Sequence, residues 1–484
     1  MLNILYIQDL SPERMKLNYY KNIIFIVVLL LVASSRVSAQ YDSENISIYS
    51  NWKDSNLTHD SLEKNYNSVW GYHDSIKNRE YAILGGKNGT YFIDVTNPFT
   101  PVLADYVPGK RGDCIWREYK NYGKYIYLIS DDSPPNSLQI ADMSYLPDSV
   151  HLIHDSDSIL VAAHTLFINE DKLYCADVKS SFNNYSSMSV YNLDNPEKPF
   201  LIKRLDQDDP DITTIHDMYI RNDTVYASAG FQGLHVYHLL SDNTLNKLGS
   251  VTSYPDIGYN HSSWLTENGK TMVFCDEVPN NLAVKVIDVS DLSDIKVLSL
   301  FKSNEGATPH NPYIIGNERV VISYYEDGVQ IYDISNPLNP VKTGFFDTHF
   351  QNNGTYDSQN AYNGCWGAYP YLPSGILLAS DRQNGLFVLD AKNALNASKS
   401  KSSKNLKIFP NPFLDKLEIQ FPEAKGSYKI YFFDLSGRTI YFKNILLQHS
   451  NNYEIMFEKE IPAGIYFLHI VGEVVTKTEK VVKF

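Results

Sequence analysis

The chain has 484 residues, a hydrophobic content of 43% and a formal net charge of −14. This length allows two or more domains with packed cores, and the negative charge argues against a nucleic-acid partner, which needs clustered lysines and arginines. The 36 tyrosines and 22 phenylalanines favour β-structure.

The first 39 residues have the features of a secretory signal peptide. Lys16 and Lys21 form a basic segment, an apolar run follows from Ile23 to Ala33, and Val37-Ser38-Ala39 resembles a small-residue cleavage site. We therefore expect the mature chain to begin at Gln40. The apolar run is short for a membrane-spanning helix, so we expect no transmembrane anchor in the mature chain.

Between residues 45 and 395, one short phrase occurs seven times: a small residue, alternating apolar residues and usually an aspartate. Successive copies end 45–57 residues apart, at Asp94, Asp142, Asn192, His238, Asp288, Asp333 and Asp390. A repeat of roughly this length, rich in short strands, is typical of a β-propeller with one blade per copy. The sequence therefore predicts an all-β protein whose first domain, residues 45–395, is a seven-bladed propeller.

The seventh blade lacks a signal for its outer strand. After Asp390 the sequence becomes a Ser/Lys-rich linker, assigned to residues 396–404. The segment at 46–52 precedes the first blade and belongs to no repeat. Because an open ring would leave an unpaired sheet edge, we predict that this N-terminal strand pairs with the seventh blade and closes the propeller.

Aligning the blades on the phrase also aligns the expected starts of their inner strands. These starts fall at Trp70, Trp116, His164, His216, His261, His310 and Trp366. The second strand of each blade runs back, so its end should lie at the same face, and several of these ends carry acids, including Asp276 and Glu277. A concave, polar-lined end of the channel is a default ligand site, so we predict ligand binding by these nine residues.

Three interpretations of this cluster are open. In the first, His164, His216, His261 and His310 coordinate a divalent metal, with Asp276 or Glu277 as a ligand or a supporting group. In the second, each His or Trp makes a hydrogen bond that ties its blade to a neighbour, as equivalent positions in a repeat would. In the third, the cluster is catalytic. No cofactor other than a divalent metal is suggested, and the sequence has no G-x-S-x-G, H-E-x-x-H or P-loop motif.

A second module occupies residues 405–484. Short alternating strands separated by Pro, Gly and Asn turns predict a small β-sandwich.

Four motifs in this module carry a family resemblance: KIFPNP (407–412), FDLSGR (433–438), IPAGIYFL (461–468) and KVVK (480–483). In this order they resemble the C-terminal sorting domain of type IX (Por) secretion substrates of Bacteroidetes. The resemblance implies export by the type IX machinery, cleavage of the domain, and surface attachment or release. The residues that it marks as the sorting signal are Pro410, Asn411, Pro412, Gly437, Arg438, Gly464, Lys480 and Lys483.

The propeller also carries a resemblance, in the segments VWGY (69–72), NHSSWLTENGKTMVFCDE (260–277), PHN (309–311) and CWGAYPYLPSGILLASDRQNGLFVLD (365–390). They resemble the LVIVD-repeat, or choice-of-anchor B, proteins over about residues 45–395. That family is secreted or surface-exposed and implies no defined activity.

Together these features predict a secreted or surface-attached propeller that binds an extracellular ligand, either a glycan or a protein. A metal-dependent hydrolase or oxidoreductase using the same histidines is the alternative enzymatic interpretation. A surface scaffold without a ligand is the third.

Overall fold

The computed structural model describes residues 41–57, 63–180, 184–350, 362–397, 406–421, 426–434, 438–448, 451–457, 461–472 and 476–484. The predicted signal peptide, most of the predicted linker and Gly437 lie outside the described residues. The chain divides into two units, Met1–Leu395 and Asn396–Phe484. In the described residues, no helix is both long and apolar enough to cross a membrane.

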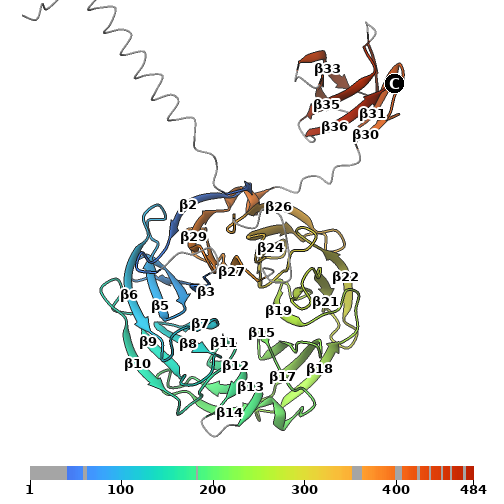
Figure 1. The fold of residues 1–484 in the computed structure, drawn as a ribbon. Coiled ribbons are helices and arrows are strands. Elements are labelled where there is room, and N and C mark those ends of the chain that lie inside the picture. Colours follow the sequence, from blue (N-terminus) through green and yellow to red (C-terminus); the bar gives the residue numbers. More distant parts are fainter. Residues whose placement is uncertain are drawn as a thin grey trace, which may run out of the picture. The chain divides into compact units, whose positions relative to one another are not determined.

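The first unit is a ring of seven antiparallel sheets, which confirms the predicted seven-bladed propeller (Figure 1). Blade 1 consists of β3 (Tyr66–Asp74), β4 (Arg79–Gly86), β5 (Gly89–Asp94) and β6 (Val102–Pro108), and blade 2 of β7 (Arg117–Tyr122), β8 (Tyr125–Ser130), β9 (Leu138–Asp142) and β10 (His151–Ser156). Blade 3 consists of β11 (Leu166–Asn169), β12 (Lys172–Lys179), β13 (Tyr185–Asn192) and β14 (Phe200–Arg204). Blade 4 consists of β15 (Asp217–Arg221), β16 (Thr224–Ser228), β17 (Leu234–Leu239) and β18 (Leu245–Val251).

Blades 5 to 7 continue the ring. Blade 5 consists of β19 (Asn260–Leu265), β20 (Thr271–Asp276), β21 (Val284–Asp288) and β22 (Lys296–Phe301). Blade 6 contains β23 (Pro312–Ile315), β24 (Arg319–Ser323), β25 (Val329–Asp333) and β26 (Val341–Phe346), and blade 7 contains β27 (Cys365–Tyr369), β28 (Ile376–Asp381) and β29 (Gly385–Asp390). A 3-10 turn, η1 (Leu205–Gln207), follows β14, and a short helix, α2 (Lys392–Asn396), follows β29.

The N-terminal strand β2 (Ser47–Trp52) supplies the missing outer strand of blade 7. It pairs antiparallel with β29, from Ser47 opposite Asp390 to Trp52 opposite Leu386, which confirms the predicted closure. The preceding strand β1 (Ser43–Glu44) also pairs with β26, so blade 6 has five strands. The N-terminal segment therefore ties two blades together.

The aspartate that ends the repeated phrase has a local structural role. In six blades its side chain, or that of Asn192, accepts a hydrogen bond from the backbone N–H two residues later, as in an Asx turn. The bonds measure 2.8–3.0 Å and involve Asp94, Asp142, Asn192, Asp288, Asp333 and Asp390. The final Asp or Asn of the phrase therefore recurs because six of the seven blades form this turn after their third strand.

The propeller core lies between neighbouring blades, since each sheet is covered on both faces. Ile83 of blade 1 and Leu128 of blade 2 share one apolar cluster, and Ile140 of blade 2 and Leu173 of blade 3 share the next. These side chains are at most 3% exposed. Because every sheet is packed from both sides, the third strands are buried at nearly every position.

The second unit contains two sheets that enclose one apolar core. Their strands are β30 (Lys407–Phe409), β31 (Lys416–Gln420) and β34 (Asn452–Met456) in one sheet, and β33 (Thr439–Leu447), β32 (Gly426–Phe433), β35 (Gly464–Gly472) and β36 (Thr476–Lys483) in the other. Leu417, Ile419, Phe432 and Leu468 are fully buried in that core. This arrangement is a small β-sandwich.

Candidate functional site

Four consecutive blades place a histidine at one end of the central channel. We call this the histidine end and define it by His164, His216, His261 and His310. The amide N–H groups of three of them donate to equivalent carbonyls on the second strands, His164 to Ala176, His216 to Ser228 and His310 to Ser323, at 2.8–2.9 Å. Their imidazole rings follow one another around the channel, with centroids 4.0, 4.2 and 4.4 Å apart, and the indole of Trp366 continues the series 4.7 Å from His310.

A chain of polar contacts connects two of these histidines to their surroundings. Nδ1 of His164 lies 2.5 Å from Oδ2 of Asp131, and its Nε2 lies 3.1 Å from Nε2 of His216. Nδ1 of His216 lies 3.2 Å from the hydroxyl of Tyr259. Both ring nitrogens of each histidine are therefore engaged, and the two Nε2 atoms face each other.

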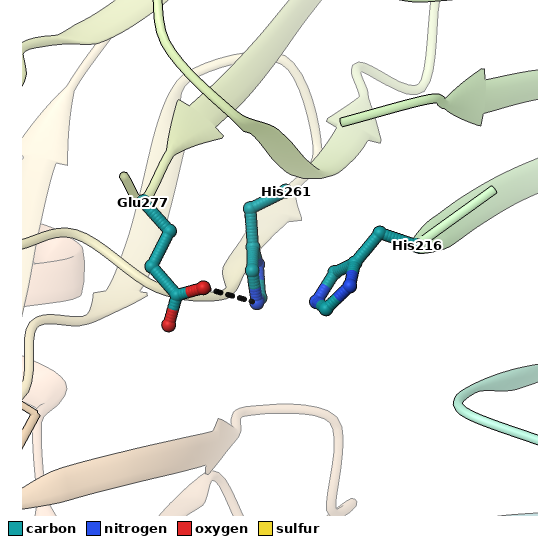
Figure 2. Close-up of side chains that lie close together, drawn as sticks. All are labelled: His216, His261 and Glu277. Carbon is teal, nitrogen blue, oxygen red and sulfur yellow. Dashed lines mark ion pairs between the residues drawn. The ribbon is translucent and has the colours of Figure 1, made fainter. Parts of the chain in front are cut away.

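His261 faces a carboxylate from its own blade. Its Nε2 lies 3.6 Å from Oε2 of Glu277, and the other oxygen of Glu277 accepts a 2.6 Å hydrogen bond from the Tyr325 hydroxyl. Figure 2 shows His216, His261 and Glu277 side by side with their polar atoms directed toward one another. Among the described residues, these three form the one group of His, Cys, Asp or Glu whose ligand atoms all lie within 4.8 Å of one another.

His310 and Asp276 have other partners. Nδ1 of His310 lies 2.5 Å from the carbonyl oxygen of Trp366, a contact that ties blade 6 to blade 7. The Asp276 carboxylate forms a 2.8 Å ion pair with Lys285, and both side chains are fully buried. Tyr254 also donates to Asp276, at 3.1 Å. Asp276 therefore belongs to the interior of blade 5, while its neighbour Glu277 belongs to the histidine end.

The two remaining tryptophans of the predicted ring lie in different surroundings. Trp116 precedes β7, is 36% exposed, and has its ring centroid 6.5 Å from that of His164, so it borders the histidine end. Trp70 does not join it. Trp70 packs against Tyr369 at 4.7 Å, lies under the ammonium group of Lys120, and donates from Nε1 to Asn121.

The opposite end of the channel is aromatic. In six blades an aromatic residue follows three positions after the His or Trp. Five of these residues define what we call the aromatic end: Phe167, Tyr219, Trp264, Tyr313 and Tyr369. The sixth, Tyr119, is buried in the core between blades 1 and 2. Neighbouring rings pack at 4.7–5.5 Å between Phe167 and Tyr219, Tyr219 and Trp264, and Trp264 and Tyr313. Trp70 stands three residues after Asn67 and belongs to this end.

A cavity of about 40 Å³ lies between the two ends and is lined by half-buried charged groups. Glu118, Lys120 and Asp217 line it together with the four histidines. Burial raises the pKa of Glu118, raises that of Asp217 to about 6, and lowers that of Lys120. The Glu118 carboxylate accepts a 2.8 Å hydrogen bond from Ser68, so the acid is held by an adjacent blade.

The histidines differ in their affinity for protons. Burial acts to lower the pKa of His164, but the hydrogen bond and charge of Asp131 outweigh it and raise the pKa above its usual value. Burial, reinforced by neighbouring imidazoles, holds the pKa values of His216 and His310 well below the usual value. Burial also lowers the pKa of His261. The lowered pKa values favour the neutral form of His216, His261 and His310, which is the form of imidazole that binds metal ions, whereas the pKa of His164 is shifted the other way.

Sequence reasoning missed several residues of this site. Tyr259 and Tyr325 hold His216 and Glu277, and the Arg382 guanidinium lies 4.7 Å over the Trp366 ring. No repeated signal marks these three. The aromatic end does have a signal, because HTLF, HDMY, HSSW, HNPY and WGAY share one spacing, which also occurs as WREY in blade 2.

In the second unit, the residues of the predicted sorting signal come together from distant parts of the sequence. Asn411, between Pro410 and Pro412, donates from Nδ2 to the Lys480 carbonyl at 2.9 Å and accepts from the Val482 amide at 3.0 Å. Gly464 pairs with Lys483 across β35 and β36. Arg438 forms an ion pair with Asp434 at 3.0 Å. The first and last of the four motifs are thus joined directly.

Residues 407–483 match the family model of the secretion system C-terminal sorting domain. This match supports export by the type IX secretion system. No curated protein matches the chain in sequence.

Solved structures of similar fold have low sequence identity to the chain. One is PorZ, described as an essential bacterial surface component of the type IX secretion system of Porphyromonas gingivalis, with 11% identity and a TM-score of 0.43 over 84% of this chain. The chain spans 58% of that protein. The WD40 β-propeller domain of Doa1 has 8% identity and a TM-score of 0.47, covering 73% of this chain and 99% of its own. A putative 6-phosphogluconolactonase from Bacteroides fragilis has 13% identity and a TM-score of 0.45, covering 82% and 99%.

Proposed function

We propose that this protein is a secreted or surface-attached propeller that binds an extracellular ligand at its histidine end. The sorting domain supports passage through the type IX machinery. We further propose that residues 1–39 act as a signal peptide for the first export step, and that the propeller belongs to the LVIVD-repeat family that its motifs resemble.

The observation that carries the binding proposal is a rim of exposed aromatic side chains around the polar histidine end. Trp116, Tyr185 and Phe231 are 36%, 42% and 70% exposed. Trp116 borders His164, the Tyr185 hydroxyl donates to Asp177 at the end of the second strand of blade 3, and the Phe231 ring packs edge-on against Tyr259 at 5.1 Å. Exposed aromatics are enriched where proteins bind partners.

The combination of flat apolar faces with hydrogen-bonding groups favours a glycan over a protein as the ligand. A sugar ring has a C–H face that can lie on an aromatic ring and hydroxyl groups that can pair with imidazoles and carboxylates. Trp and Tyr combine a large apolar face with a polar atom, which suits such a ligand.

The test is binding of purified, exported protein to a panel of extracellular polysaccharides, measured by calorimetry. We expect saturable binding, and we expect the double variant Trp116→Ala, Phe231→Ala to weaken it at least tenfold. The matched control is Phe200→Ala, because Phe200 is 52% exposed on the outer strand β14. Equal losses in the control and the double variant would contradict the proposal. Binding to a secreted protein but to no glycan would replace the glycan by a protein ligand.

A further inference from the structure

The histidine end brings together the donor set of a transition-metal site. Three imidazoles and one carboxylate come from blades 3, 4 and 5: His164, His216, His261 and Glu277. Zn²⁺ is commonly bound by histidine nitrogens and carboxylate oxygens, usually four in a tetrahedral arrangement. The chemistry of the set therefore fits zinc and excludes a preference for calcium or magnesium, which take oxygen ligands.

The spacing of the donor atoms is close to what a tetrahedral ion requires. Metal–ligand bonds near 2.0–2.1 Å place neighbouring donors about 3.4 Å apart. The two Nε2 atoms of His164 and His216 are 3.1 Å apart, and Nε2 of His261 is 3.6 Å from Oε2 of Glu277. His216, His261 and Glu277 lie within 4.8 Å of one another. His164 is not part of this group of three and reaches it through its contact with His216, so an ion shared by all four residues requires the His164 ring to move toward His261 and Glu277.

Outer contacts fix the orientation of three of these ligands. Asp131 accepts from Nδ1–H of His164, which leaves the lone pair of the neutral ring on Nε2, directed at Nε2 of His216. Tyr259 contacts Nδ1 of His216, and Tyr325 donates to the Glu277 oxygen that faces away from His261. Metal-binding histidines almost always have such a partner on their second nitrogen.

A hydrogen-bonded chain without metal explains only half of the arrangement. If Nε2–H of His216 donates to His164, the contacts from Tyr259 through His216 and His164 to Asp131 are all satisfied. His261 and Glu277 are then left facing each other at 3.6 Å, which is too long for a hydrogen bond. A shared cation satisfies both pairs.

We propose that the histidine end binds one Zn²⁺ ion through Nε2 of His164, His216 and His261 and the carboxylate of Glu277. This replaces His310, which donates to the Trp366 carbonyl, by Glu277 in the predicted metal set. The inference rests on the same end of the channel as the proposed function, but metal binding is measured with no extracellular ligand present. A negative result for Zn²⁺ binding therefore does not contradict the proposed ligand binding, and a negative result for ligand binding does not contradict the proposed Zn²⁺ site.

The test uses the exported chain purified without a polyhistidine tag, treated with chelator and dialysed. Titration with Zn²⁺, followed by calorimetry, should give one site per chain. Co²⁺ bound to the same protein should give the strong visible absorption of a four-coordinate ion, and Zn²⁺ should abolish it.

Variants then assign the ligands. We expect His216→Ala and Glu277→Gln each to weaken Zn²⁺ binding by about 100-fold or more, and Asp131→Asn, which removes only an orienting contact, by about 10- to 100-fold. The control is His238→Ala, which removes a half-buried imidazole from β17 in the same blade as His216. Glu277 has a side chain 15% exposed, so its variant tests the site even if a histidine variant fails to fold.

Loss of Zn²⁺ affinity in the three site variants, with unchanged affinity in the control, supports the proposal. Absence of a stoichiometric Zn²⁺ site in the folded wild-type protein overturns it, as does equal weakening in His238→Ala.

Discussion

The two ends of the propeller channel are built from the same strands but have opposite chemistry. At the histidine end, polar rings face carboxylates and the aromatic rim is exposed. At the aromatic end, Phe167, Tyr219, Trp264 and Tyr313 pack against one another. In five blades, the residue at the histidine end and the residue at the aromatic end are three positions apart. The comparison shows that one repeated backbone can hold a binding surface at one end and a packed closure at the other.

A second contrast lies between the adjacent acids Asp276 and Glu277. Asp276 is the last residue of β20 and Glu277 is the first residue after it. Asp276 enters blade 5, where it pairs with Lys285, and Glu277 reaches His261. Asp276 therefore contributes to the stability of blade 5, and the adjacent Glu277 contributes to the candidate site.

The largest effect should come from Asp276→Ala. This change leaves the fully buried Lys285 without its anion, so we expect a loss of about 3–5 kcal/mol in the free energy of unfolding. Chemical denaturation followed by tryptophan fluorescence measures it. Glu277→Gln is the matched neighbour and should change stability by less than about 1 kcal/mol. Similar losses of unfolding free energy in both variants would contradict the different roles assigned to Asp276 and Glu277.

Trp264→Ala should have the next largest effect, at the aromatic end. The indole contacts Phe167, Tyr219, Tyr313 and Tyr371, so its removal creates a gap and should lower the free energy of unfolding by about 3 kcal/mol. Zn²⁺ affinity should stay within about threefold of wild type, which calorimetry checks. A stable variant with lost Zn²⁺ binding would show that the two ends are not separate.

His216→Ala should have the converse pattern. The imidazole contacts His164 and Tyr259, and losing these two hydrogen bonds should lower the free energy of unfolding by about 1–2 kcal/mol, while Zn²⁺ binding is lost. Thermal unfolding of the metal-free protein measures the change in stability, and titration with Zn²⁺ measures the loss of metal binding. A loss as large as that of Trp264→Ala would identify the histidine end as mainly structural.

The smallest effect concerns pH. Burial raises the pKa of Asp347, which follows the outer strand β26, to about 6, with Asp381 and Asp327 adding to the shift and His349 opposing it. The folded state therefore holds this proton more tightly than the unfolded chain does. Stability should fall as pH rises from about 4 to 6, and Asp347→Asn should reduce that fall by about 1 kcal/mol or less, given its partial exposure. Unfolding midpoints at pH 4 and pH 7 test this, and an unchanged pH dependence in the variant would contradict it.

The fold could be predicted from the repeat because its last residue is needed locally, as an Asx turn, in almost every blade. The closing strand could be predicted because blade 7 lacked a partner that residues 46–52 could supply. The residues of the candidate site were harder to predict from the sequence. Counting back from the phrase placed Trp70 with the histidines, but the equivalent position is Asn67, which lies in the bulge of β3 as His261 and Trp366 lie in the bulges of β19 and β27.

Other features of the site depend on contacts that no spacing reveals. Asp276 and Glu277 are adjacent in the sequence, and only the burial of Lys285 beside Asp276 shows which acid leaves the histidine end. Tyr259 and Tyr325 come from loops whose paths are set by packing between blades. The spacing of three between histidine and aromatic residues was visible in the sequence and would have assigned Trp70 to the aromatic end.

The closure of the ring by β2 has a consequence for folding. Tyr49 on β2 bonds to Asp390 at the end of blade 7, across 341 positions of sequence. Contacts between residues so far apart form slowly, because the loop between them must first be ordered. Strand β2, which is synthesised early, therefore stays unpaired until the seventh blade has formed. A chain held unfolded during export avoids premature pairing of that edge, and the ring can lock only after the whole propeller has emerged.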